Sequence, residues 1–407
     1  MRPMARNHKL PRVAFVSTHP IQYHAPWFRA LANRPDIEMR VLYCHKASPQ
    51  DQAKAGFGVE FDWDVSLLDG YACEFLTNVS SKPGMGFWGM DTPELPKRIA
   101  RGGYDAVVVN GWHYRSAWQA LQACWRTGTP ILARGDSNLK TPRHPVKMGA
   151  KWPFYRLFIP RLDACLAVGA WSREYFLHYG ARPERVFEVP HIVDSDRISS
   201  EASAWEEKRP EFRRKWSLPE DDAVFLFAGK FVEGKRPLDF VRAIGQACSM
   251  GIRISGLMVG DGALRQACMA EARESAAPVR FTGFLNQKEI VQAYVAADAL
   301  VLPSAGETWA MVVNEAMACN RACFLSDQVG AAPDLIEEGQ TGATFPCGNV
   351  GELAALLKQY ADRQVLSAMG ECARKKIAAY SPSVAADRLV TAVRSTLTKA
   401  GKHRRAA

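Results

Sequence analysis

The chain has 407 residues, of which 47% are hydrophobic and 23% are charged. That length allows two domains with separate cores, and the composition is typical of a soluble globular protein. Because no apolar run approaches the roughly 20 residues of a membrane-spanning helix, the sequence also predicts no transmembrane segment.

The formal net charge of +10 suits nucleic acid, anionic lipid or a polyphosphate ligand. The basic residues are dispersed and no nucleic-acid-binding signature occurs, so we expect no nucleic acid partner. The N-terminus lacks a secretory apolar core and cleavage site, which predicts a cytoplasmic protein. The ten cysteines form no CxxC pair, which favours reduced core thiols over disulfides or a zinc site.

Short apolar strands alternate with helical segments through the first half of the chain. Strands that are apolar along their whole length, separated by helices, predict a parallel sheet covered on both faces. The expected strands are 12–18, 38–44, 105–111, 130–135, 164–169 and 185–190.

The same rhythm returns in the second half, after a polar and charge-rich stretch at 194–220 that we expect to be an interdomain linker. The second set of expected strands is 223–229, 253–260, 279–284, 299–304, 322–327 and 342–346. The sequence therefore predicts an α/β protein with two doubly wound, Rossmann-like domains, 1–193 and 221–380. Residues 381–407 are expected to form a C-terminal helix and basic tail that pack back on the first domain.

Ligands of open α/β sheets lie at the carboxyl ends of the strands, so residues just after strands are the candidates for a site. In the first domain, "STHPIQYHAPWF" follows the first strand and "VNGWHYRSAW" follows a later one. These stretches carry His19, Gln22, Tyr23, His24 and His113. A lone histidine is more often structural, and that alternative stays open for His113.

A third first-domain candidate is Arg134, in the stretch "ARGDS" that follows a strand. Arg134 and Asp136 either line the cleft or pair with each other.

In the second domain, "AGKFVEGKRP" places three cations at a strand exit: Lys230, Lys235 and Arg236. This grouping suits a diphosphate, although a solvated turn has the same composition.

Two glutamates flank the start of an otherwise apolar helix, in "PSAGETWAMVVNEAMA". Free N–H groups at a helix start bind anionic oxygens. Glu307 lies at that start, where its own charge favours a sugar hydroxyl over phosphate as partner. Glu315 follows two turns later, and a buried carboxylate there is stable if it accepts hydrogen bonds from two vicinal hydroxyls, as on a ribose, or if it pairs with Arg or Lys.

The second half resembles family 4 of the retaining glycosyltransferases, which have the two-domain GT-B fold. The resemblance rests on the spacing Glu307-x7-Glu315, the "G-K-x4-K" run at 229–235 and "DLIEEGQTGATF" at 334–345. The first half matches more loosely, through "LAVGAWSREYFLHYGARPERVFEVPHIVD" at 166–194.

The resemblance implies roles for individual residues. Lys230 and Lys235 would hold the donor diphosphate, and Glu315 would bind the ribose. Glu307 and His113 would face the transferred sugar as the catalytic candidates. The remaining donor contacts would be backbone amides near Thr308, Trp309 and Ala310, while His19, Gln22, Tyr23, His24 and Arg134 are acceptor-side candidates.

The chain also departs from the family pattern. Relatives often have glycine where this sequence has Arg236, Ala310 and Asn320. Arginine is common in relatives at the position of Lys230.

The expected function is retaining transfer of a hexose from a nucleotide-sugar to a glycan or lipid-linked acceptor, in bacterial cell-surface polysaccharide synthesis. A nucleotide-sugar epimerase and a catalytically silent GT-B subunit are the alternatives. We expect no metal and no other cofactor, because two lysines neutralise the diphosphate. The strings "DWD" (62–64) and "DSD" (194–196) are accordingly not assigned to a metal.

A basic and aromatic segment at 147–162 suits peripheral contact with an anionic membrane on the inner face. A buried helix with exposed charged ends is the alternative. The residues concerned are Lys147, Lys151, Arg156, Arg161, Trp152, Phe154, Tyr155 and Phe158.

Overall fold

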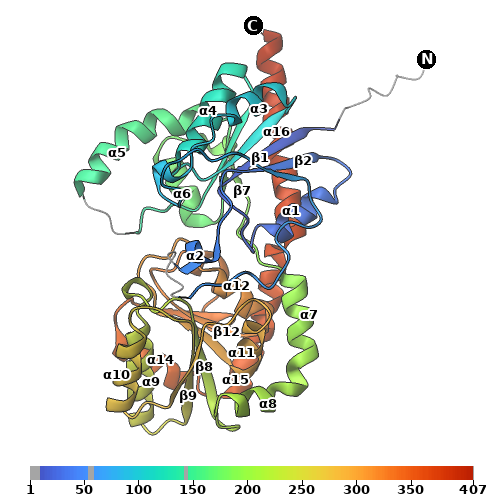
Figure 1. Ribbon diagram of the computed structural model, residues 1–407. Helices are drawn as coiled ribbons and strands as arrows, with labels where there is room; N and C mark the ends of the chain where they lie inside the picture. Colours follow the sequence, from blue (N-terminus) through green and yellow to red (C-terminus); the bar gives the residue numbers. More distant parts are fainter. Residues whose placement is uncertain (1–9, 54–58, 142–144, 407) are drawn as a thin grey trace.

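A computed structural model describes residues 10–53, 59–141 and 145–406. It shows two α/β domains, each a parallel sheet with helices on both faces, which lie one above the other in Figure 1. A cleft lies between them. No helix among these residues is both long and apolar enough to cross a bilayer.

The first sheet has seven strands in the order β3-β2-β1-β4-β5-β6-β7, and every pairing is parallel. Its strands are β1 (Arg12–Ser17), β2 (Glu38–Tyr43), β3 (Cys73–Phe75), β4 (Ala106–Asn110), β5 (Ile131–Gly135), β6 (Ala164–Ala167) and β7 (Val186–Glu188).

The second sheet has six strands in the order β10-β9-β8-β11-β12-β13, again all parallel. Its strands are β8 (Ala223–Ala228), β9 (Ile254–Val259), β10 (Val279–Gly283), β11 (Ala299–Leu302), β12 (Ala322–Ser326) and β13 (Gly342–Phe345). The predicted fold class and all twelve expected strands are confirmed. Among the strands of the described residues, sequence analysis missed only β3, because two partly buried residues and the exposed Phe75 make no apolar run.

The helices cover both faces of each sheet and create four hydrophobic clusters, two per domain. Around the first sheet lie α1 (Ala25–Ala32), α2 (Pro49–Gln52), α3 (Leu95–Arg101), α4 (Arg115–Thr127), α5 (Pro145–Phe158), α6 (Ala170–His178) and α16 (Pro382–Ala406). Around the second lie α7 (Ser195–Trp205), α8 (Arg209–Lys215), α9 (Pro237–Ser249), α10 (Arg265–Glu274), α11 (Ile290–Ala296), α12 (Met311–Ala318), α13 (Ala332–Leu335), α14 (Val350–Gln359) and α15 (Arg363–Ile377).

The last helix, α16, leaves the second domain and runs along the first (Figure 1). Its buried side chains Leu389 and Val393 pack in the same cluster as Trp27 and Phe28 of α1. The chain therefore crosses between the domains twice, and its C-terminal helix is part of the first domain's core.

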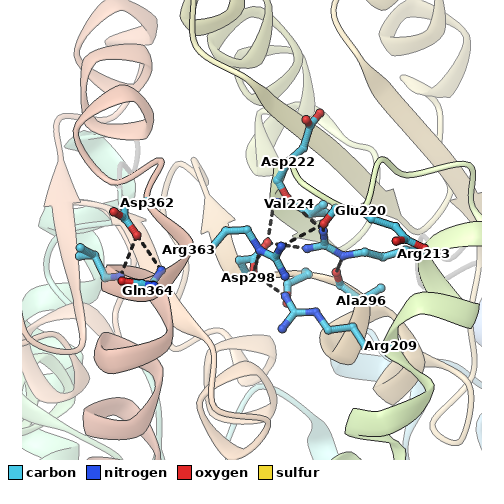
Figure 2. A network of polar contacts seen from close by, with 12 residues as sticks. Arg209, Arg213, Glu220, Asp222, Val224, Ala296, Asp298, Asp362, Arg363 and Gln364 are labelled. Atoms are coloured by element: carbon cyan, nitrogen blue, oxygen red, sulfur yellow. Dashed lines mark hydrogen bonds and ion pairs between the residues drawn. The ribbon is translucent and has the colours of Figure 1, made fainter.

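The stretch 194–220, expected to be a linker, is folded onto the second domain as α7 and α8. The buried Arg213 holds it there: its guanidinium donates to Ala296 O (3.0 Å) and Glu220 O (2.7 Å) and pairs with Asp298 Oδ2 (2.7 Å). Figure 2 shows Asp298 at the centre of this network, where it also accepts from Val224 N at 2.8 Å. Some of the charges that suggested a linker are therefore buried. They are stable there because arginine and aspartate pair with each other and hydrogen-bond to the backbone.

Candidate functional site

A cleft of about 510 Å³ lies between the domains, at the carboxyl ends of strands from both sheets. Its volume is in the range of sites for small organic ligands. It brings together nearly every site residue predicted from the sequence: Gln22, Tyr23, His24, His113, Arg134, Lys230, Lys235, Glu307, Thr308, Trp309, Ala310 and Glu315.

His19 is the exception, since its side chain is not among those that line the cleft. Its Nδ1 lies 3.1 Å from Thr18 Oγ1, and burial, followed by the charge of His45, lowers the pKa of His19 to about 4. His113 does line the cleft: it lies in the short connection from β4 to α4, and partial burial lowers its pKa, which favours the neutral imidazole.

The basic wall of the cleft comes from the connection between β8 and α9. Lys235 closes a short 3-10 turn (Glu233–Lys235), and its Nζ contacts Glu307 Oε1. Burial, together with the nearby charge of Lys230, lowers the pKa of Lys235 to about 8, and burial also lowers the pKa of Lys230. Two ammonium groups therefore face one ligand-sized space in which water screens them poorly.

The turn that carries Glu307 is fixed by its neighbours before α12 begins. Glu307 N donates to Gln328 O (3.1 Å), and Gly330 N donates back to Glu307 O (3.2 Å). A side chain at Gly330 would collide with the carbonyl of Thr308, so this close approach requires glycine there. The turn delivers the first N–H groups of α12 to the cleft.

Arg236 (51°), Ala310 (88°) and Asn320 (58°) are among the non-glycine residues of this domain that adopt positive φ. They are the three positions where relatives often carry glycine. The backbone therefore keeps the positive φ that glycine adopts easily at these positions. Arg236, Ala310 and Asn320 adopt it at a steric cost, because their Cβ atoms crowd the backbone.

Glu315 is buried, with 1% of its surface exposed. Tyr294 Oη donates to its Oε2 (2.7 Å), and Gln287 Nε2 approaches its Oε1 (3.4 Å). Burial raises the pKa of this carboxyl, and the hydrogen bonds and the more distant charge of Arg197 oppose that shift. Of the two sequence alternatives, direct pairing with Arg or Lys is not what the described residues show: uncharged donors hold the carboxylate at the edge of the cleft.

The first domain supplies a second polar wall. Arg134 has 3% of its surface exposed, and its guanidinium donates to Pro190 O (3.1 Å), lies 3.2 Å from His191 Nδ1 and sits over the Trp27 ring (5.0 Å). Arg134 thus lines the cleft instead of pairing directly with Asp136.

Asp136 joins the two domains. Its Oδ2 accepts a hydrogen bond from Thr308 Oγ1 (3.0 Å) and lies 3.9 Å from His191 Nε2. A second bridge runs from Asn314 Nδ2 to His191 O at 3.3 Å. The polar surfaces of the two domains are therefore in contact at the cleft.

Sequence analysis missed several residues of the site. Gln287 and His191 lie just after β10 and β7, so the rule that placed Lys230 would have found them. Tyr294 lacks such a signal, because it lies within α11 and only tertiary packing brings it to Glu315.

Two family models match the chain, and together they span most of it. The model described as Glycosyl transferases group 1 matches residues 208–376, and that described as Glycosyltransferase Family 4 matches residues 29–197. The chain belongs to the family 4 glycosyltransferases of GT-B fold. The two matches correspond to the second and the first domain, respectively.

Curated relatives of this glycosyltransferase carry names of the same class. D-inositol 3-phosphate glycosyltransferase of Geodermatophilus obscurus is 28% identical over 353 residues, which are 78% of this chain and 74% of the relative. GDP-mannose-dependent alpha-mannosyltransferase of Mycobacterium tuberculosis is 29% identical over 254 residues, 60% of this chain and 62% of the relative.

Among solved structures, the Anabaena protein HepE in complex with UDP superposes with a TM-score of 0.71 and 16% identity. The match covers 95% of this chain and 100% of HepE. At that identity the likeness concerns the fold, and it agrees with the two parallel sheets described above.

Proposed function

We propose that this glycosyltransferase moves a hexose, with retention, from a nucleotide-sugar to a glycan or lipid-linked acceptor, in bacterial cell-surface polysaccharide synthesis. The observation that carries the proposal is the convergence of two lysines, a helix start and a buried carboxylate in one cleft. A nucleoside diphosphate presents the matching groups in the same order: two phosphates, then a ribose diol.

In this assignment Lys230 and Lys235 bind the diphosphate, and the N–H groups at the start of α12 assist them. The leaving diphosphate gains negative charge as the sugar departs. Fixed cations in a cleft with little water stabilise that charge more in the transition state than in the ground state. The two lysines supply the charge, so no metal is required.

The transferred sugar is assigned to Glu307 and His113, which face the cleft from opposite domains. Glu307 accepts hydrogen bonds from sugar hydroxyls, and the diphosphate takes over its present contact with Lys235. The bond from C1 to the phosphate oxygen breaks, and a bond from C1 to the acceptor oxygen forms on the same face. The acceptor proton moves to an oxygen of the leaving diphosphate.

The acceptor is assigned to the first-domain wall formed by Gln22, Tyr23, His24 and Arg134. His24 is buried, and burial lowers its pKa, so it offers a neutral imidazole to an acceptor hydroxyl.

Peripheral membrane contact is proposed through α5. Trp152, Phe154 and Leu157 are exposed, whereas Phe158 is buried and Tyr155 Oη accepts a hydrogen bond from Trp112 Nε1 (3.0 Å). The outward-facing part of the helix therefore presents these three apolar side chains beside the exposed Arg156. Sedimentation with anionic vesicles, released by salt, tests this part of the proposal. The side chain of Lys147 lies outside the described residues.

The central experiment incubates the protein with UDP-, GDP- and ADP-sugars, with and without glycan or lipid-linked acceptors. We expect one donor to be consumed only when an acceptor is present, with an α-linked product from an α-linked donor. Isomerised donor recovered without acceptor would favour the epimerase, and nucleotide binding without turnover would favour a silent subunit.

A further inference from the structure

A segment of the first domain reaches across the cleft and lies on the second domain. It follows α2, which Figure 1 places in the space between the domains. Asn286 Nδ2 donates to Asp62 O (2.8 Å), and Lys288 N donates to Asp64 Oδ2 (3.1 Å). We call residues 61–64 the strap.

Aromatic packing reinforces these hydrogen bonds. The Phe61 ring lies 4.3 Å from that of Phe284, centroid to centroid, and the Trp63 ring packs edge-on against Phe61 at 4.8 Å. Trp63 itself lines the cleft, as do Phe284, Leu285 and Gln287 of the loop after β10. Two aromatic side chains of the first domain thus cover the loop that is next to Glu315.

The position of this loop indicates which part of a bound nucleotide would lie against Trp63. This step rests on the proposed function. With the diphosphate on Lys230 and Lys235 and the ribose on Glu315, the base points away from the lysines. Gln287 contacts Glu315 and belongs to the loop that the strap covers, so the base enters the space between that loop and Trp63.

We propose that Trp63 forms one wall of the nucleoside subsite and that the strap makes base binding a property of both domains. The ligand class is the base of a nucleoside diphosphate, held between the indole and the apolar edge of the loop at Leu285. An aromatic side chain against a base is a favourable and sequence-tolerant contact. The strap also explains the string "DWD": Asp64 accepts from the Lys288 backbone, and the two aspartates flank the residue that the strap positions.

The experiment measures affinity by titration calorimetry for UDP, GDP and ADP, and for inorganic pyrophosphate, which lacks a base. The nucleotide that binds wild type most tightly is then titrated into Trp63→Ala, Trp63→Phe and Trp88→Ala. Trp88 is a matched control, because it is exposed in the first domain and is not among the residues that line the cleft.

We expect Trp63→Ala to weaken nucleotide binding about tenfold to a hundredfold and to leave pyrophosphate binding unchanged. Trp63→Phe should retain most of the affinity and Trp88→Ala all of it. The nucleotide should also quench part of the tryptophan emission in wild type, and that part should vanish in Trp63→Phe. A purely structural strap would not produce this optical signal.

Two outcomes overturn the inference while leaving the proposed function standing. One is nucleotide affinity that is unchanged in folded Trp63→Ala. The other is an equal loss for nucleotide and pyrophosphate, which would mean that the substitution disturbs the whole cleft. If wild type binds none of the nucleotides, the proposed function itself fails.

Discussion

Replacing Glu315 with glutamine separates a ligand-binding role from a structural one. Tyr294 Oη donates to Glu315 Oε2 at 2.7 Å, and a glutamine carbonyl in the same place can accept that bond. The amide nitrogen, however, cannot accept from a ribose hydroxyl. The variant therefore keeps its hydrogen bond from Tyr294 and loses acceptor capacity toward the ligand and toward Gln287.

The structure predicts opposite effects on binding and on stability. Charged hydrogen bonds to the ribose are worth roughly 1.5–3 kcal/mol, so Glu315→Gln should weaken nucleotide binding about tenfold to a hundredfold. Burial raises the pKa of Glu315, which means that the folded state disfavours its charged form. Removing the charge should therefore leave the free energy of unfolding at pH 7.5 unchanged or higher.

The difference in free energy of unfolding between Glu315→Gln and wild type should also depend on pH, in a direction that follows from the raised pKa of Glu315. A carboxyl whose folded pKa is raised destabilises the folded state once the pH exceeds its usual range, and this cost disappears as the pH falls and the folded protein binds a proton. The stability of Glu315→Gln relative to wild type should thus grow with rising pH. Glu315→Ala should instead lose about 2 kcal/mol, because it leaves the Tyr294 hydroxyl without an acceptor and opens a cavity.

Calorimetric titration with nucleotide and urea unfolding at several pH values measure both quantities. The reasoning is refuted if Glu315→Gln binds nucleotide like wild type, or if it is markedly less stable while Tyr294→Phe is not. Either result would make Glu315 a structural member of the α11–α12 contact.

Three further predictions concern the same domain. Because the pKa of Lys235 is lowered to about 8, nucleotide affinity should fall by up to about tenfold per pH unit above pH 8, and Lys235→Met should lose most of this dependence in calorimetric titrations. Transferase activity should survive excess EDTA, since two lysines neutralise the diphosphate; loss with chelator and recovery with manganese or magnesium would contradict this. Ala310→Gly should raise the free energy of unfolding by up to about 1 kcal/mol in urea titrations. The reason is that positive φ costs alanine roughly 1–2 kcal/mol, which exceeds the entropy that glycine adds to the unfolded chain. A destabilised variant would show that the turn is not strained.

The sheet could be predicted because its information is local. Buried parallel strands need apolar residues on both faces, and runs such as 105–111 and 223–229 satisfy that requirement alone. The packing of 194–220 on the second domain could not be predicted, for the opposite reason. The charge of Arg213 is neutralised by Asp298, 85 residues later in the chain, and no local pattern reveals that pairing.

The candidate site divides in the same way. Lys235 and Glu307 follow strands and were found from the sequence, whereas their direct contact depends on how two separate connections meet. Trp63 belongs to a connection with no strand pattern, and it reaches the cleft because its neighbour Phe61 packs on the loop after β10. Site residues that follow a strand can be predicted from the sequence. Site residues that reach the cleft because one domain packs against the other cannot.

The contacts that close the cleft and the groups proposed to bind the donor belong to the same short segments. Thr308, which donates to Asp136 across the domains, is adjacent to Glu307 in the turn before α12. Asn314, which donates to His191 O, is adjacent to Glu315 on α12. A rotation that separated the domains would break both hydrogen bonds and carry His113 and Trp63 away from the second domain. A donor that binds the second domain and also contacts these two residues therefore favours the closed arrangement by its differential affinity for it. Closure and assembly of the donor site are, on this geometry, one event.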